Sequence, residues 1–172
     1  MAGKAIGVSM NYGYPGNYAR TPDDVTVSRV IKASSVSPVP FGACLKLNTD
    51  NTVELVGAGF TAAALAGIAV REVKTPTNFM AQNTVQYRQG EVCDALVRGA
   101  IIVTCNVGTP TAGGAVYVRI AANASIPDGV VGGFEAAADS SNTVLLPNVK
   151  WTTGAMDANK CCEVTILTRV NP

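Results

Sequence analysis

The chain has 172 residues, and its 13 basic and 12 acidic side chains give a formal net charge of +1. The basic residues are scattered singly, so no basic stripe exists to neutralise a phosphate backbone, which argues against nucleic-acid binding. Charged residues make up 15% and hydrophobic residues 48% of the chain, whereas about 25% charged residues is usual. This composition favours a subunit of an oligomer or of a larger assembly.

The sequence predicts neither an export signal nor a membrane-spanning segment. Residues 1–10 include Lys4 but lack the apolar core of a signal peptide. The longest apolar run, Leu55–Val70, is interrupted by glycines and a threonine and falls short of the roughly 18 to 20 residues that a bilayer requires. We therefore expect no membrane partner.

Residues 11–24 read NYGYPGNYARTPDD, which is rich in Tyr, Gly, Pro and Asn and has no periodicity. We expect residues 1–24 to form an extended N-terminal arm or loop and residues 25–172 to form the body. Tyr12, Tyr14 and Tyr18 either fold back over their own domain or dock on a partner. Docking is attractive because Tyr combines large apolar area with a hydrogen-bonding tip and a low entropy cost.

Runs of β-branched residues with apolar positions at every second residue predict strands through the rest of the chain. The clearest runs are Ala100–Val107, Ala115–Ala121 and residues 162–169. Further strands are predicted at Val25–Lys32, Gly42–Leu47, Thr52–Val56, Gly67–Lys74, Gly90–Val97 and Thr143–Trp151. The pattern predicts an all-β fold, a single β-sandwich or barrel-like domain of about eight to ten strands.

Alternation also predicts which side chains face the core. In Ala115–Ala121, Val116, Val118 and Ile120 should point inward, and Tyr117 and Arg119 outward. Helical signals are confined to Phe60–Ala66 and Phe134–Ala138, each long enough for one or two turns at most.

The residues offer little for catalysis, because the chain has no histidine and a Ser-His-Asp or Cys-His arrangement is therefore impossible. A carboxylate-dependent hydrolase would need a facing pair of acids, drawn from Glu54, Glu72, Glu91, Glu135 and Glu163. Few aromatic residues are available to build a sugar-binding cleft beside such a pair. We expect a non-enzyme without cofactor or metal.

The five cysteines form no CxxC pattern and predict neither a zinc site nor a disulfide framework. They are Cys44, Cys93, Cys105, Cys161 and Cys162. The simplest interpretation is that all are buried thiols made and kept in a reducing cytoplasm. An intermolecular disulfide through Cys161 or Cys162 is the alternative.

The order of local phrases along the chain carries a resemblance. The chain runs GYPGNYAR at 13–20, PFGACLKL at 40–47, GIAVREVK at 67–74, YRQGEVCDALVRGAIIV at 87–103, GGAVYVRI at 113–120, LLPNVKW at 145–151 and DANKCCEVTI at 157–166. This succession resembles the structural cement proteins of tailed bacteriophages. Cys161–Cys162 departs from the resemblance, which would suggest a small pair there.

The resemblance implies a capsid decoration protein, made in the host bacterial cytoplasm, that binds the outer surface of the expanded head and stabilises it against internal DNA pressure. Its implied partners are the major capsid protein and itself, as a homotrimer or alternatively a homodimer. We expect capsid contacts from the tyrosine-rich arm and subunit contacts from the outer face of Ala115–Ala121. The residues concerned are Tyr12, Tyr14, Pro15, Tyr18 and Arg20 for the capsid, and Tyr117 and Arg119 for the subunits.

The competing hypothesis is a non-catalytic β-sandwich module on a virion surface that binds carbohydrate or a host receptor. Such a module needs an exposed aromatic stacking platform, and Trp151 is the only tryptophan in the chain.

Overall fold

The computed structural model describes residues 11–72 and 85–170. These residues are almost entirely β, which confirms the predicted fold class, and two single 3-10 turns occur at Ala62–Ala64 and Ser140–Asn142. The strands are β1 (Tyr18–Val30), β2 (Val39–Pro40), β3 (Cys44–Leu47), β4 (Val53–Leu55), β5 (Leu65–Ala69), β6 (Gln86–Tyr87), β7 (Val92–Val107), β8 (Ala115–Arg119), β9 (Phe134–Glu135), β10 (Thr143–Trp151) and β11 (Cys161–Ile166). No helix in these two ranges is long and apolar enough to cross a bilayer.

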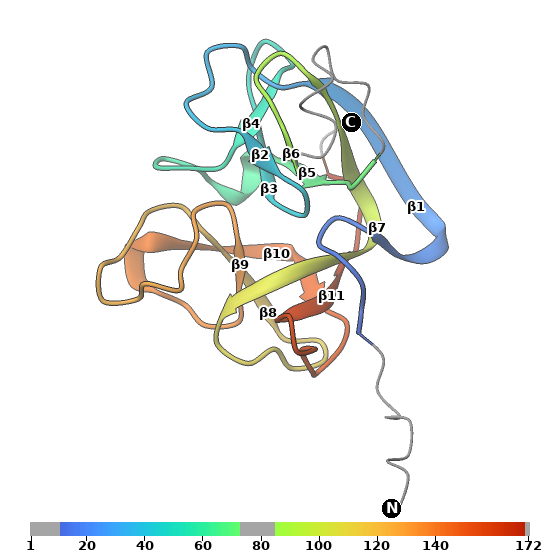
Figure 1. Cartoon of the computed structure of the whole chain (residues 1–172), viewed down its shortest axis with the longest axis vertical. Helices are drawn as coiled ribbons and strands as arrows, with labels where there is room; N and C mark the ends of the chain where they lie inside the picture. The colour runs from blue at the N-terminus through green and yellow to red at the C-terminus, as the bar shows by residue number, and fades with distance from the viewer. Residues whose placement is uncertain (1–10, 73–84, 171–172) are drawn as a thin grey trace, which may run out of the picture.

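Five strands close into a barrel, seen as the lower lobe of Figure 1. Going around the barrel, β7 pairs with β11, β11 with β10, β10 with β8, β8 with β9, and β9 with β7 again. The β7–β9 pairing is parallel and the other four are antiparallel. Closure pairs the strand edges of this lobe with each other. The backbone N–H and C=O groups that an open edge would leave unpaired are therefore hydrogen-bonded within the barrel.

The barrel interior is filled by the apolar faces that the sequence predicts. Ile101, Val103 and Cys105 of β7 are buried in one cluster with Val116 and Val118 of β8 and with three residues of β11. Those three are Cys162, Val164 and Ile166. Trp151 and Phe134 belong to the same cluster, which continues into the other lobe through residues such as Cys44, Ile68 and Leu96.

A second lobe is built on the first half of β7, in the upper part of Figure 1. Here β1 and β5 flank β7, and β3 and β4 extend the sheet. The sheet curls until Ile31, just after β1, forms a parallel bridge with Val53 of β4. The curl encloses a separate apolar cluster that includes Ile31, Leu45 and Tyr87.

β7 corrects one prediction, since Gly90–Val97 and Ala100–Val107 belong to a single strand of 16 residues. Gly99, between the two predicted runs, has φ +118, and a Cβ there would lie 2.5 Å from the carbonyl oxygen of Asp23. Glycine therefore lets β7 bend without ending, and the strand serves both lobes.

Two further boundaries differ from the predictions. β1 begins at Tyr18, within the segment predicted as an arm, because Tyr18 pairs with Ile101 and Arg20 with Ala100 of β7. For Phe134–Ala138 the sequence predicts one or two helical turns at most, and in the structure Phe134 and Glu135 form β9 between β7 and β8. Both differences arise from distant strands that local composition does not reveal. The predicted strand Gly67–Lys74 overlaps β5 over Gly67–Ala69 only; residues 70–72 lie outside any strand, and residues 73 and 74 lie outside the described residues.

Candidate interaction surfaces

A tight turn at Tyr14–Asn17 leads the chain into β1. Asn17 N donates a hydrogen bond to Tyr14 O at 3.1 Å, and Gly16 has φ +88. Proline at the second position and a glycine with positive φ at the third are the signature of a type II turn. The YPGN phrase thus specifies this turn locally.

The turn is fastened to both lobes by backbone hydrogen bonds. Gly16 N donates to Ile102 O at 2.8 Å, and Arg71 N donates to Gly16 O at 2.8 Å. Ile102 N donates to Asn17 O at 2.9 Å. A Cβ on Gly42 would lie 2.8 Å from Gly16 N, so the two glycines permit this close approach. The turn is a rigid part of the body.

Tyr14 stands on this turn with 63% of its surface exposed. The Arg71 guanidinium carbon lies 4.9 Å from the Tyr14 ring centroid and 5.5 Å from that of Phe41, within the range of cation–π attraction. Phe41 packs edge-on against Tyr87 at 5.1 Å, and the Tyr87 hydroxyl donates to Val70 O at 2.6 Å. The group Tyr14, Arg71 and Phe41 is here called the aromatic platform. The buried Tyr87 ring therefore supports this platform through Phe41.

The other residues predicted for capsid contact are either half-buried or, in the case of Arg20, paired with a carboxylate. Pro15 is half-buried beside the platform, and half-buried Tyr12 donates its backbone N–H to Asp157 Oδ2 at 3.0 Å. The hydroxyl of half-buried Tyr18 donates to Glu72 Oε1 at 3.0 Å; burial and this hydrogen bond raise the pKa of Tyr18 to about 12. Arg20 is exposed, but its Nε donates to Glu163 Oε1 at 2.6 Å. Tyr14 is thus the accessible aromatic of this set.

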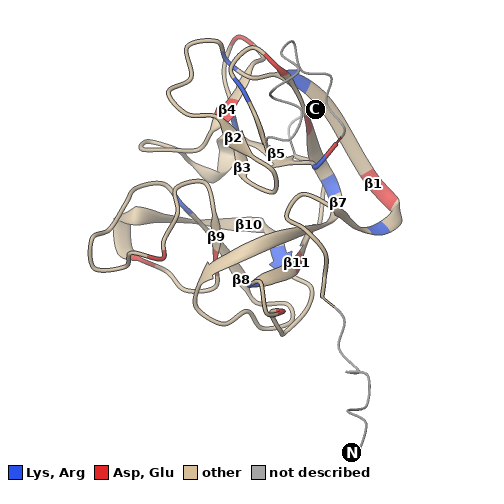
Figure 2. Cartoon of the chain, viewed as in Figure 1, with Lys and Arg blue, Asp and Glu red and all other residues tan. Residues whose placement is uncertain are grey.

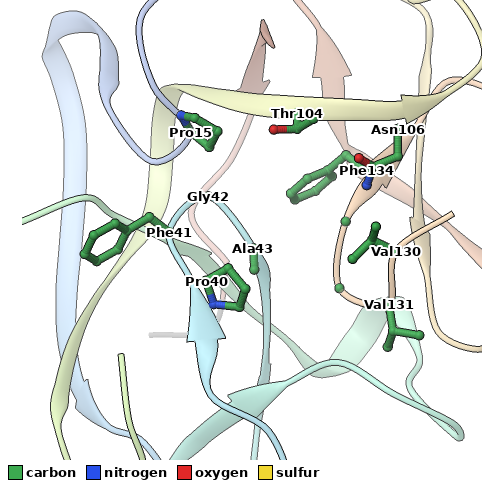
Figure 3. A pocket seen from close by; sticks show the side chains of 12 residues that line it. Pro15, Pro40, Phe41, Gly42, Ala43, Thr104, Asn106, Val130, Val131 and Phe134 are labelled. Atoms are coloured by element: carbon green, nitrogen blue, oxygen red, sulfur yellow. The ribbon is translucent and has the colours of Figure 1, made fainter. Parts of the chain in front are cut away.

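A cleft lies between the two lobes next to the platform (Figure 3). Its volume is about 140 Å³. One wall is Pro15 and the connection from β2 to β3, and the other comes from β7 and the loop before β9. The lining residues are Pro15, Pro40, Phe41, Gly42, Ala43, Thr104, Asn106, Val130, Val131, Gly132, Gly133 and Phe134.

Tyr117 of β8 lies directly opposite Leu145 of β10 in the barrel wall. Tyr117 is half-buried, and Leu145 is 45% exposed. The two side chains form a small apolar patch on the outer face of the barrel, here called the β8–β10 patch. The sequence does not predict Leu145 as a contact residue, because the exposure of its side chain depends on its register with β8.

Arg119 corrects a prediction, because it is fully buried instead of facing solvent. Its guanidinium forms a two-pronged ion pair with Glu135 and reaches Asp139 Oδ2 at 2.8 Å. A Cβ on Gly129 would collide with the guanidinium. Arg119 does sit on the outer face of β8, but the 121–132 loop covers it. Arg119 is therefore an anchor for this loop.

Three of the glutamates considered for a hydrolase are paired with basic side chains. Glu54 pairs with Lys46 at 3.1 Å, Glu135 with Arg119, and Glu163 with Arg20. Figure 2 shows the charged residues distributed over separate elements. Within the described ranges no cluster of acidic or cysteine side chains could hold a metal ion.

The cysteine thiols and the tryptophan side chain are also buried. All five cysteines are free and buried. Burial raises the pKa of the Cys44, Cys93 and Cys161 thiols, so they are poor nucleophiles at neutral pH. Trp151 is 1% exposed and cannot serve as a stacking platform for a sugar.

This chain is similar in structure to a chain in the solved capsid of Myoviridae phage XM1, with a TM-score of 0.67. The alignment covers 99% of this chain and 100% of that chain at 16% identity, which shows a shared fold. No curated protein sequence matches this chain.

The sequence matches a family model over residues 3–167. That model describes the structural cement protein of phages (E217 gp24/Pam3 gp6). Because the match spans nearly the whole chain, this protein belongs to the family of phage structural cement proteins, whose role is structural and associated with the capsid.

Proposed function

We propose that this protein decorates the outer surface of an expanded tailed-phage head and stabilises it against internal DNA pressure. The observation that carries the proposal is the exposed Tyr14 on a turn fastened to both lobes. A large aromatic that is already held in place loses little entropy on binding and is typical of the residues that dominate interface energies. Membership of the cement protein family supports the same role.

The mechanism is mass action. A protein that binds the expanded shell, and not the unexpanded or broken one, adds its binding free energy to the expanded shell alone. A trimer attaches through three copies of the same surface, so each later contact is effectively intramolecular and modest affinity per contact suffices. We assign the capsid contact to Tyr14 with Pro15, and the subunit contact to Tyr117 with Leu145.

The test is cosedimentation of the purified protein with expanded empty heads and with unexpanded heads. The wild type should sediment with the expanded heads alone. Tyr14→Ser removes the exposed ring and should weaken binding at least about tenfold, as expected for an interface anchor. Leu167→Ser is the matched control, because Leu167 is 52% exposed and belongs neither to the platform nor to the cleft.

Failure of the wild type to bind expanded heads would refute the decoration function. Binding of the Tyr14→Ser variant equal to that of the wild type would remove Tyr14 from the contact and leave the function standing.

A further inference from the structure

We propose that the cleft between the two lobes receives an uncharged, apolar segment of the capsid protein on which the chain sits. This inference rests on the proposed function and names what the contact recognises. The cleft is distinct from the Tyr14 ring, which stands on the surface next to it.

The electrostatic character of the cleft selects the kind of segment. None of the described residues that line it is charged, and its polar side chains are Thr104 and Asn106. A charged side chain entering such a site would lose hydration without gaining a partner, which is strongly unfavourable. The rim adds exposed apolar surface, since Val130 is 54% exposed.

The cleft is preformed because both of its walls are fixed by backbone hydrogen bonds. On one side, Gly42 N donates to Ala69 O at 2.8 Å. On the other side, Gly132 N donates to Arg119 O at 2.9 Å, and Cys44 N donates to Gly132 O at 3.0 Å. The last of these bonds joins the two walls directly. A site that does not have to open or order itself keeps more of its interaction free energy for the ligand.

The position of the cleft selects the partner. Its volume of about 140 Å³ leaves room for side chains of a bound segment. Pro15 belongs both to the Tyr14 turn and to the cleft lining, so a capsid protein that contacts Tyr14 is the partner within reach of the cleft.

The first experiment compares Val130→Asp with Val92→Asp in the cosedimentation assay with expanded heads. The two valines have similar exposure, 54% and 57%, and Val92 does not line the cleft. Val130→Asp should weaken binding about tenfold or more, because the introduced carboxylate must be desolvated, whereas Val92→Asp should bind within about twofold of the wild type. Circular dichroism of both variants checks that the fold is kept.

The second experiment identifies the occupant. A photo-crosslinking benzophenone amino acid is placed at Val131 in the protein bound to heads, and the crosslinked peptide is sequenced by mass spectrometry. An uncharged stretch of capsid protein is the expected product. A crosslink to a second copy of this chain, or to a charged capsid segment, would overturn the inference.

The outcomes separate the two proposals. If the wild type does not bind heads, the decoration function fails. If it binds and Val130→Asp binds equally well, the function stands and the cleft is not the recognition site.

Discussion

At the scale of single residues, Arg119 shows how a correct strand pattern leads to a wrong site assignment. The alternation of β8 places Arg119 and Tyr117 on the same face, opposite Val118, and that is where they lie. The face is covered at Arg119 by the 121–132 loop, and the guanidinium is paired with Glu135 and Asp139. Hydrogen bonds from Asn123 and Arg119 lower the pKa of Asp139, which keeps this carboxylate charged within the network.

We predict that Arg119→Met lowers the free energy of unfolding by about 3–5 kcal/mol, because it leaves the buried Glu135 carboxylate without its counter-ion. Chemical denaturation measures the change. The matched control is Lys160→Met, which removes an exposed pair with Asp128 and should cost less than about 1 kcal/mol. Equal effects of the two substitutions would show that the Arg119 network contributes no more than a surface ion pair.

At the scale of elements, the β8–β10 patch is the part of the barrel wall that suits contact between copies of the chain. Tyr117 and Leu145 lie side by side in register, and the 45% exposure of Leu145 leaves apolar surface open. Aromatic and aliphatic residues of this kind are typical of the centre of subunit interfaces. Arg119, which was expected to accompany Tyr117, is not available to a partner.

We predict that the wild-type protein is a trimer in solution and that Leu145→Asp is a monomer, because the introduced carboxylate would be buried in the interface between subunits. Light scattering of the purified protein measures the mass. Val30→Asp is the control, since Val30 is also 45% exposed and lies on the other lobe; it should leave the trimer intact. A wild-type monomer, or a Leu145→Asp trimer, would argue against a subunit contact at this patch.

The elements differ in how far the sequence could predict them. β8, β10 and β11 have their own alternation and were located to within a few residues, and Thr143–Trp151 matches β10 at both ends. The two-residue strands β2, β6 and β9 were missed, because a pair of residues carries no period. β1 was predicted to start too late, because its first residues are polar and are held by β7, about 80 positions further along the chain.

At the scale of the whole molecule, the fold class follows from the sequence but the candidate surfaces do not. Alternation and composition predict an all-β body. The aromatic platform joins Tyr14, Phe41 and Arg71, and the cleft joins segments that are still further apart. Such sites form where the two lobes contact each other. No local sequence pattern indicates which distant segments will lie together there.

We predict that saturating protein raises the temperature at which filled, expanded heads release their DNA. At a free concentration about 100 times the dissociation constant, binding stabilises each site by about 2.7 kcal/mol. Dye fluorescence during heating follows DNA release. Heads mixed with Tyr14→Ser at the same concentration should release DNA at a lower temperature than heads mixed with wild type; an unchanged release temperature with bound wild type would show attachment without reinforcement.

The long strand β7 also determines the order in which the chain can fold. Its partners β1 and β5 precede it, but β9 and β11 follow it, and the barrel stays open until β11 pairs with both β7 and β10. Pairings between such distant segments give a high contact order, which is typical of domains that fold in milliseconds to seconds. During synthesis the strands of the first lobe are therefore complete before the barrel can close, and β11 is the strand that closes it.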